Sequence, residues 1–534
     1  MTVDAFKRFS AHSFHHPALA FTFDWSRAGI ARSTIEAFGP KLVSAFERMG
    51  ALEGGALANS DEQRRVGHYW LRSPELAPEA ALRSEIEATV ARVLELAERV
   101  RSGAIAPPSG GRFTEAVVVG IGGSALGPQL LIDALAGADA PVTVHFADNT
   151  DPDGFDRLIA RLGANLARTL VVVISKSGGT KETRNGMLEL ENAFRLQGLE
   201  FARHAIAITQ AGSELDSRAE AAGFVARLPM WDWVGGRTSV TSAVGLFPSA
   251  LAGIDVTALL AGAAEMDRAT RATDVFVNPA ALLACIWYAL GDGNGRRAMV
   301  MLPYKDSLQL SSRYLQQLVM ESLGKRDDRA GNTVSQGLTV YGNKGATDQH
   351  AYAQQLLDGP DDFFVTFIEI LKDRAGTSLE VEPGITSGDY LSAFLQGTRR
   401  ALEAREKPSL TLTFSEVNAR ALGAFIALYE RAVGLYAELV DVNAYHQPAV
   451  ESGKVAAAAV LTLQRRAVAI LPVSPDAART ARELAESLGT DEVDALFVAL
   501  RHLAANGRIH ATSSADPSAV RFCRGAAPGE GSSA

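Results

Sequence analysis

Residues 169–183 read TLVVVISKSGGTKET, and this stretch decides the fold that we predict. Its first six residues form an apolar run that is too short for a helix, as is typical of a strand buried on both faces of a parallel sheet. Similar runs occur at 116–121 (AVVVGI), 142–147 (VTVHFA) and 204–209 (HAIAIT), with helix-like segments between them. Strands and helices that alternate in this way predict a doubly wound α/β domain.

The same alternation begins again farther along the chain, where AMVMLPY, GLTVYG and DFFVTFIEIL are predicted strands. We therefore expect four parts: an N-terminal helical region at 1–111, α/β domains at 112–270 and 271–470, and a C-terminal helical segment with a flexible tail at 471–534. The segment RSEIEATVARVLELAERVR has the apolar spacing of a helix, which favours the helical N-terminal region. The final residues, APGEGSSA, have a composition typical of disorder.

Composition indicates a soluble, cytoplasmic protein. Apolar residues make up 47% of the 534 residues, and the net charge is −9, which argues against bulk binding to nucleic acid or to an anionic membrane. We find neither a signal peptide nor an apolar run of roughly 18 residues. The two cysteines, Cys285 and Cys523, provide neither a disulfide framework nor the spacing of a metal site, and Cys285 is predicted to lie in the core.

Two glycine-rich turns follow predicted strands, where open α/β sheets bind their ligands. One is GIGGSALGP, residues 120–128. The other contains three hydroxyl groups, on Ser175, Ser177 and Thr180, and the charge of Lys176, and a predicted helix follows it. Hydroxyls, backbone amides and a helix N-terminus together predict a phosphate site. Neither turn is a Walker A loop or has the GxGxxG spacing of a dinucleotide site, and a tight connection is the alternative interpretation of each.

Catalytic candidates occur near the end of the first predicted domain and within the second. Arg237 follows two glycines in GGRTSVTSAVGLFP and is either a surface arginine or a fixed cation near developing negative charge. Residues 311–325 are predicted to form a helix on which Arg313, Gln317 and Glu321 share one stripe; a solvated face is the alternative.

Three further polar residues occur in later segments. His350 lies in GNKGATDQHAYAQQLL, and a lone histidine is usually structural or exposed to solvent. Gln447 and Lys454 lie seven residues apart in DVNAYHQPAVESGK, and in a helix they would share one face. None of these residues is decisive alone.

Taken together, the segments resemble the glucose-6-phosphate isomerase family. The resemblance rests on GIGGSALGP, SKSGGTKET, GGRTSVTSAVG, YLQQLVMESLGK, DQHAYAQQLLDG and NAYHQPAVESGK, which occur in the family's order over about residues 118–460. It implies two sugar-isomerase (SIS-type) α/β sandwich domains with extra N- and C-terminal helices. It also implies a cytoplasmic homodimer with shared active sites, and reversible isomerisation of glucose 6-phosphate and fructose 6-phosphate in glycolysis and gluconeogenesis, with no metal or other cofactor.

The resemblance also implies a role for each matching position. Glu321 matches the base that moves a proton between C1 and C2, and Arg237 matches the cation beside the enediolate. His350 and Lys454 match the groups that open the sugar ring, and the family usually supplies this histidine from the second subunit. The positions that match phosphate and substrate contacts are Gly123, Ser124, Ser175, Lys176, Ser177, Thr180, Gln317 and Gln447.

Some positions depart from the family pattern. Gly179 stands where many relatives have threonine, so a hydroxyl is missing from the predicted phosphate site. His446 stands where many have an acidic residue, which changes the charge near Lys454. The loop NKGATDQH also differs from the commoner form, although Gln349 and His350 remain.

Two other functions fit part of the pattern. A related SIS-fold isomerase acting on mannose 6-phosphate would share the phosphate site, but the segments around Arg237 and Lys454 favour the glucose enzyme. A non-catalytic sugar-phosphate-binding regulator would not need Glu321, His350 and Lys454 together. The segment ELAESLGTDEVDALFVALRHL resembles a helix-turn-helix, but its acidic residues argue against contact with nucleic-acid phosphates.

Overall fold

The computed structural model describes residues 3–525, without the side chains of residues 3 and 450–452. The predicted tail at 527–534 lies outside the described residues. The chain divides into two compact units, Met1–His446 and Gln447–Ala534, and each is described by itself. Within the described residues, no helix is long and apolar enough to cross a membrane.

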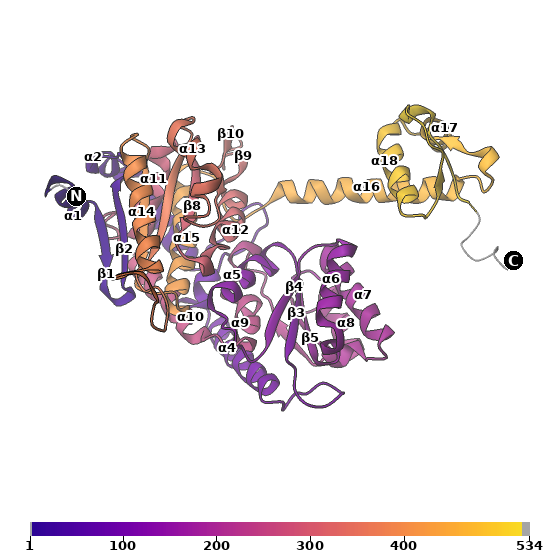
Figure 1. The fold of residues 1–534 in the computed structure, drawn as a ribbon, viewed down its shortest axis with the longest axis horizontal. Coiled ribbons are helices and arrows are strands. Elements are labelled where there is room, and N and C mark those ends of the chain that lie inside the picture. Colours follow the sequence, from indigo (N-terminus) through magenta and orange to yellow (C-terminus); the bar gives the residue numbers. More distant parts are fainter. Residues whose placement is uncertain (1–2, 526–534) are drawn as a thin grey trace. The chain divides into compact units, whose positions relative to one another are not determined.

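The first sheet of the larger unit is parallel throughout, with the strand order β4-β3-β5-β6-β7. Its strands are β3 (Glu115–Val119), β4 (Thr143–Ala147), β5 (Thr169–Ile174), β6 (Ala205–Thr209) and β7 (Ala226–Pro229). Figure 1 labels three of its strands, β3, β4 and β5. The four strands predicted here are confirmed to within two residues at each end, and β7 is an additional edge strand that the sequence analysis did not identify.

The apolar run of β5 is explained by burial on both faces of this sheet. Val171 and Val173 belong to a hydrophobic cluster with residues of α6 (Pro152–Leu162), α7 (Lys181–Leu196) and α8 (Glu214–Ala222). Leu170 and Val172 face the opposite cluster, which includes residues of α4 (Ala80–Arg101), α5 (Leu126–Leu135) and α9 (Ala243–Leu251). Alternate residues of one strand therefore fill two cores, as the predicted α/β class requires.

The second sheet has the order β1-β2-β15-β12-β8-β11. The strands β8 (Ala298–Pro303), β11 (Val340–Tyr341), β12 (Phe363–Ile370) and β15 (Ser409–Phe414) run parallel. Residues of α10 (Val256–Ala269), α11 (Pro279–Leu290) and α15 (Ala419–Leu439) form the core on one face, and residues of α13 (Gln349–Asp358) and α14 (Ser387–Glu403) pack on the other. Cys285 is fully buried on α11, as predicted.

The N-terminal region corrects one expectation. It contains the predicted helices, α1 (Val3–Ala11), α2 (Arg32–Glu36), α3 (Gly39–Glu53) and α4, but it is not purely helical. The hairpin β1 (Ser13–His16) and β2 (Phe21–Arg27) pairs antiparallel with β15 and extends the second sheet. The segment FTFDWSR has the aromatic residues and the alternation of a strand, and its pairing with β15 buries Phe21, Phe23 and Trp25.

The smaller unit has its own hydrophobic core. The helices α16 (Pro448–Ile470), α17 (Ala481–Leu488) and α18 (Val493–Ala505) contribute Leu463, Leu484, Leu496 and Leu500 to it. The predicted pair of C-terminal helices is confirmed. A small antiparallel sheet was not predicted; its order is β16-β18-β17, and its strands are β16 (Arg479–Thr480), β17 (His510–Ala511) and β18 (Arg521–Cys523). The unit begins at Gln447 and not near 471, because α16 packs with these helices. The predicted boundary between residues 270 and 271, in the larger unit, stays a prediction.

Candidate active site

The turn after β5 has the geometry of an anion cradle. Gly178 N–H donates to Ser175 Oγ at 3.1 Å, and Ser175 Oγ donates to Thr180 Oγ1 at 3.2 Å. Gly178 has φ +72°, and a Cβ there would lie 2.3 Å from the backbone N of Leu215, so this position requires glycine. No side chain caps the N-terminus of α7, which leaves its first N–H groups open to an anion.

The second glycine turn lies beside this cradle and joins it to two other segments. A Cβ on Gly120 would lie 3.3 Å from the carbonyl oxygen of Ile174, the last residue of β5. A Cβ on Gly123 would lie 1.9 Å from the carbonyl oxygen of Gly236, and one on Gly122 would lie 3.0 Å from Gln317 Nε2. Only glycines allow these approaches, so segments far apart in the sequence meet here.

Arg237 and Glu321 face each other at this junction. Arg237 lies in the short helix η7 (Gly236–Thr238), and its Nη1 is 3.7 Å from Glu321 Oε1. Its Nη2 donates to the carbonyl oxygens of Ala444 at 3.0 Å and His446 at 3.3 Å. Arg237 is only 8% exposed, so it is a buried cation and not a surface arginine. Burial lowers the pKa of its guanidinium, and the nearby Glu321 carboxylate opposes that shift.

Glu321 ends a π-helical turn. The predicted helix at 311–325 is present to residue 323: α12 (Ser311–Leu315) is followed by the π turn η9 (Gln316–Glu321) and two more helical residues. A strand, β9 (Lys325–Asp327), then pairs with β10 (Thr333–Gln336). The expectation of one regular helix is therefore wrong at its C-terminal end, because Lys325 pairs with Gln336 in this hairpin. The Glu321 side chain is 22% exposed, and π turns frequently occur at functional sites.

A buried lysine lies directly behind Glu321. Lys325 is 5% exposed, and its Nζ donates to the backbone carbonyl of Glu321 at 2.7 Å. Burial, reinforced by the charge of Arg237 and opposed by Glu321, lowers the pKa of Lys325 to about 7. The sequence analysis quoted this lysine as part of a motif but assigned it no role.

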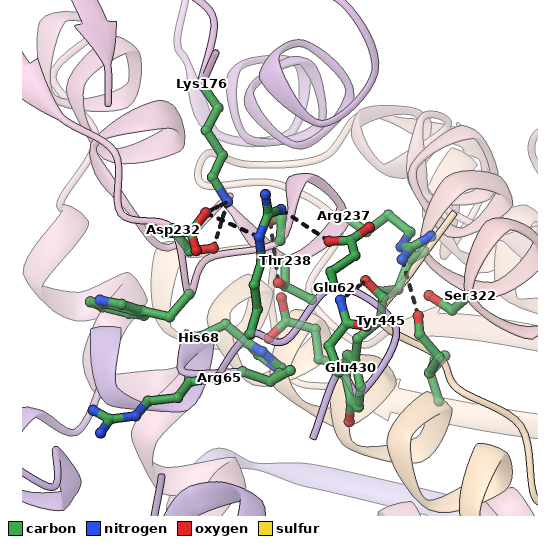
Figure 2. A pocket seen from close by; sticks show the side chains of 18 residues that line it. Glu62, Arg65, His68, Lys176, Asp232, Arg237, Thr238, Ser322, Glu430 and Tyr445 are labelled. Atoms are coloured by element: carbon green, nitrogen blue, oxygen red, sulfur yellow. Dashed lines mark hydrogen bonds and ion pairs between the residues drawn. The ribbon is translucent and has the colours of Figure 1, made fainter. Parts of the chain in front are cut away.

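Lys176 turns away from the hydroxyls that flank it. Its Nζ donates to the carbonyl oxygens of Asp232 at 2.6 Å and Val234 at 3.0 Å, and lies 3.6 Å from the Asp232 carboxylate. Figure 2 shows the side chain directed at this segment. Lys176 therefore ties the cradle to the loop that leads into Arg237.

A cavity of about 50 Å³ lies beside Arg237 (Figure 2). Its lining includes Glu62, His68, Lys176 and Tyr445. His68 is 1% exposed, and burial, together with nearby arginines, lowers its pKa well below the usual value, so its ring is neutral.

A family model described as phosphoglucose isomerase matches residues 24–394 and 397–470. The chain belongs to this family. Two relatives named glucose-6-phosphate isomerase support the assignment. The protein from Geobacter sp. (strain M21) is 58% identical over 502 residues, which are 94% of this chain and 95% of the relative. The protein from Thermosynechococcus vestitus is 57% identical, over 93% of this chain and 94% of the relative.

Solved structures agree with the phosphoglucose isomerase assignment. A glucose-6-phosphate isomerase from Chlamydia trachomatis has a TM-score of 0.78 at 25% identity, covering 90% of this chain and 94% of that one. A hypothetical protein from Thermus thermophilus has a TM-score of 0.68 at 28% identity, covering 80% of this chain and 97% of that one.

The structure gathers part of the predicted site. One junction brings together the segments that carry Gly123, Ser124, Arg237, Gln317 and Glu321, and the cradle from Ser175 to Thr180 adjoins it.

The remaining predicted residues are on other elements of the chain. His350 is exposed in the first turn of α13, and among the described residues no side-chain hydrogen bond or ion pair joins it to Arg237 or Glu321. Gln447 is the N-cap residue of α16, and Lys454 is exposed on the same helix; both belong to the smaller unit.

Lys325, Asp232 and His68 have contacts in this region that no sequence pattern predicted. The signal for Lys325 was present, because it follows the glycine of the quoted motif YLQQLVMESLGK and ends it. The identity of a residue as lysine does not by itself reveal whether its side chain is buried or exposed. Asp232 and His68 come from segments that carried no motif, so only their contacts reveal them.

Proposed function

We propose that this phosphoglucose isomerase family member interconverts glucose 6-phosphate and fructose 6-phosphate through ring opening and a cis-enediol(ate) intermediate. The observation that carries the proposal is the buried Arg237 facing Glu321 at 3.7 Å, beside a turn lined with hydroxyls and backbone N–H groups. A carboxylate, a fixed cation and an anion cradle are the three groups that this proton transfer requires.

The cradle binds the substrate's phosphate in this proposal. The hydroxyls of Ser175, Ser177 and Thr180 and the open N–H groups at the start of α7 bind its oxygens. Gly123 and Ser124, in the neighbouring turn, contact the sugar, as does Gln317. Lys176 contributes positive charge near the phosphate and holds the 232–234 segment in place.

Glu321 is the base that moves the proton. Its carboxylate removes the proton from C2 of the open-chain aldose, and the electron pair forms the enediolate. The same carboxyl then returns the proton to C1, while the hydroxyl proton moves from O2 to O1 and the C2–O2 bond becomes the ketone carbonyl. Arg237 supplies a positive charge that is already fixed beside the developing oxyanion, so little reorganisation is needed in the transition state.

Ring opening requires groups from other parts of the assembly. We assign it to His350 and Lys454, with Gln447 as a further substrate contact, and we propose that His350 acts in the site of a second copy in a homodimer. The exposed position of His350 on α13 supports this assignment. The reaction belongs to glycolysis and gluconeogenesis, and we propose the cytoplasm as its location.

The test is turnover of fructose 6-phosphate by the purified protein with a chelator present, with glucose 6-phosphate followed through a coupled dehydrogenase. Rapid formation of product is expected. Glu321→Gln should lower kcat by about 1,000-fold or more while fructose 6-phosphate still binds, because an amide cannot accept the proton. Glu189→Gln, an exposed change on α7, is the matched control and should keep full activity.

Other outcomes would redirect the proposal. Turnover of mannose 6-phosphate but not fructose 6-phosphate would favour another SIS-fold isomerase. Binding of phosphosugars without turnover of any would favour a regulator. Full activity of Glu321→Gln would remove Glu321 as the base.

A further inference from the structure

Lys325 has an environment that the proposed chemistry does not yet explain. It follows Glu321 by four residues, and among the described residues its only side-chain hydrogen bond is to the Glu321 carbonyl at 2.7 Å. Within the same part of the chain, no carboxylate lies within ion-pair distance of its Nζ. Lys325, which is 5% exposed, therefore has a single backbone oxygen as the hydrogen-bond acceptor of its ammonium group, close to the Arg237–Glu321 pair.

Such a group is expensive to bury for structural reasons alone. The end of a helical turn leaves carbonyl groups that water or backbone N–H groups can satisfy. Here the N–H of Gly324 already donates to the carbonyl of Met320 at 2.8 Å. Burying a charged amine to satisfy one more carbonyl costs more than burying an apolar side chain of the same length. The lysine is therefore better explained by an effect on Glu321.

We propose that Lys325 is a positioning residue that holds Glu321 in the orientation in which its carboxylate reaches the substrate. The inference rests on the proposed function, since it concerns the base of that reaction. Lys325 acts through the backbone of Glu321 and through its charge, and it does not touch the substrate.

Two physical effects follow from this position. The hydrogen bond closes the turn between Glu321 and Lys325, which fixes the direction of the Glu321 side chain. The ammonium also places a second buried positive charge near the carboxylate, in addition to Arg237, so its removal changes the electrostatic field at that carboxylate. The groups that act on Lys325 are Arg237, Glu321 and Asp61, and Arg237 is in turn influenced by Glu62 and Tyr445.

The main experiment is Lys325→Met in the full chain, with kcat, KM and the pH dependence of kcat/KM measured with fructose 6-phosphate. Loss of the hydrogen bond should lower kcat about 10- to 100-fold with KM nearly unchanged, because a small misplacement of a catalytic group has effects of this size. Loss of the charge should also move the acid limb of the profile up by roughly half a pH unit or more. A merely structural lysine would not move that limb.

Three further variants separate the two effects. Lys325→Arg keeps the charge and the donor and should leave the acid limb unchanged, with kcat restored above that of Lys325→Met. Gly324→Ala alters the same turn without changing charge, because its Cβ would lie 2.6 Å from the Met320 carbonyl oxygen. It should lower kcat but leave the acid limb in place. Lys372→Met, which removes an exposed lysine paired with Glu416, is the matched control and should behave like the wild type.

The outcomes decide the proposal. Wild-type kcat and an unmoved acid limb in Lys325→Met would overturn it. If that variant does not fold, Lys325→Gln, which keeps an N–H donor without the charge, should give the shifted limb. If neither folds, Lys325 is a structural residue and the proposal is wrong. Glu321→Gln tests the proposed function separately from the role of Lys325. If this variant stays active, Glu321 is not the base, whatever the contacts of Lys325.

Discussion

Two adjacent glycines in the anion cradle after β5 have different physical roles. Gly178 has a positive φ, and a Cβ there would collide with the backbone of Leu215. Gly179 has neither restriction, since the nearest atom to an added Cβ is Ser177 Oγ at 3.8 Å. The cradle therefore depends on Gly178 for its shape, whereas Gly179 is a position where a side chain fits.

This difference gives a prediction at the residue scale. Gly178→Ala should destabilise the protein by about 1–3 kcal/mol and raise the KM for fructose 6-phosphate about ten-fold, because the turn must shift away from the phosphate. Gly179→Ala is the internal control and should change stability by less than about 0.5 kcal/mol. Urea unfolding and steady-state kinetics measure both quantities, and equal effects at the two positions would contradict the assignment.

The buried Lys325 also predicts a pH dependence of stability. Its pKa falls from 10.5 in the unfolded chain to about 7 in the folded protein, chiefly because of burial. Between these values the folded protein binds fewer protons than the unfolded chain, so the free energy of unfolding rises as the pH rises. From pH 7 to pH 9, the wild type should gain up to about 2 kcal/mol relative to Lys325→Met. Urea unfolding at both pH values measures this, and parallel curves would show that folding does not lower the pKa of Lys325.

At the scale of elements, the N-terminal hairpin is an integral part of the second sheet. The strand β2 pairs with β15 over five registered positions, and its aromatic residues face the same core as α10 and α15. Without β2, the edge of β15 would expose unpaired backbone groups, which favours aggregation. The hairpin therefore stabilises the sheet that positions the helices packed on it.

Phe23 and Thr22 provide a matched test on this strand. Phe23→Ala removes a fully buried ring and should lower the free energy of unfolding by about 3–5 kcal/mol. Thr22→Ala, on the opposite side of the same strand, should cost less than about 1 kcal/mol. Denaturant unfolding of the two variants decides between an integral strand and a loosely attached arm, for which both changes would be small.

The short π turn is the element that sequence periodicity describes least well. Its sequence, QQLVME, is compatible with a regular helix. The prediction that Gln317 and Glu321 share one face used the residue spacing of a regular α-helix. The actual turn is wider, and Lys325 begins a strand soon after it. The local pattern predicts a helical segment here, but the change of pitch depends on how the turn packs against its neighbours.

At the scale of the whole molecule, the smaller unit has a core of its own. Leu500 is fully buried in that core, whereas Val498 on the same helix is 53% exposed. Leu500→Ala should reduce protection from hydrogen exchange in residues 471–525 by about 2–5 kcal/mol while β5 in the larger unit exchanges as before. Val498→Ala should change neither region. Loss of protection in both units after Leu500→Ala would show that they unfold together.

The sequence by itself determined the class of the fold and predicted the residues of the candidate site. Short apolar runs such as TLVVVI predict buried parallel strands because only such strands are apolar on both faces, and four of them were located to within two residues. The ordered motifs pointed to the family because the chemistry requires particular residue types at fixed positions. Glycine turns, hydroxyl groups and single charged residues can be recognised directly in the sequence.

Only the tertiary structure decided how those residues meet. Arg237 and Glu321 are 84 positions apart in the chain, and nothing in either segment predicts the 3.7 Å between them. The burial of Lys325, the direction of Lys176 toward Asp232 and the pairing of the N-terminal hairpin with β15 were likewise decided by long-range packing. A local pattern reports the preference of a segment, whereas contact, burial and the resulting pKa values depend on partners that are distant in the sequence.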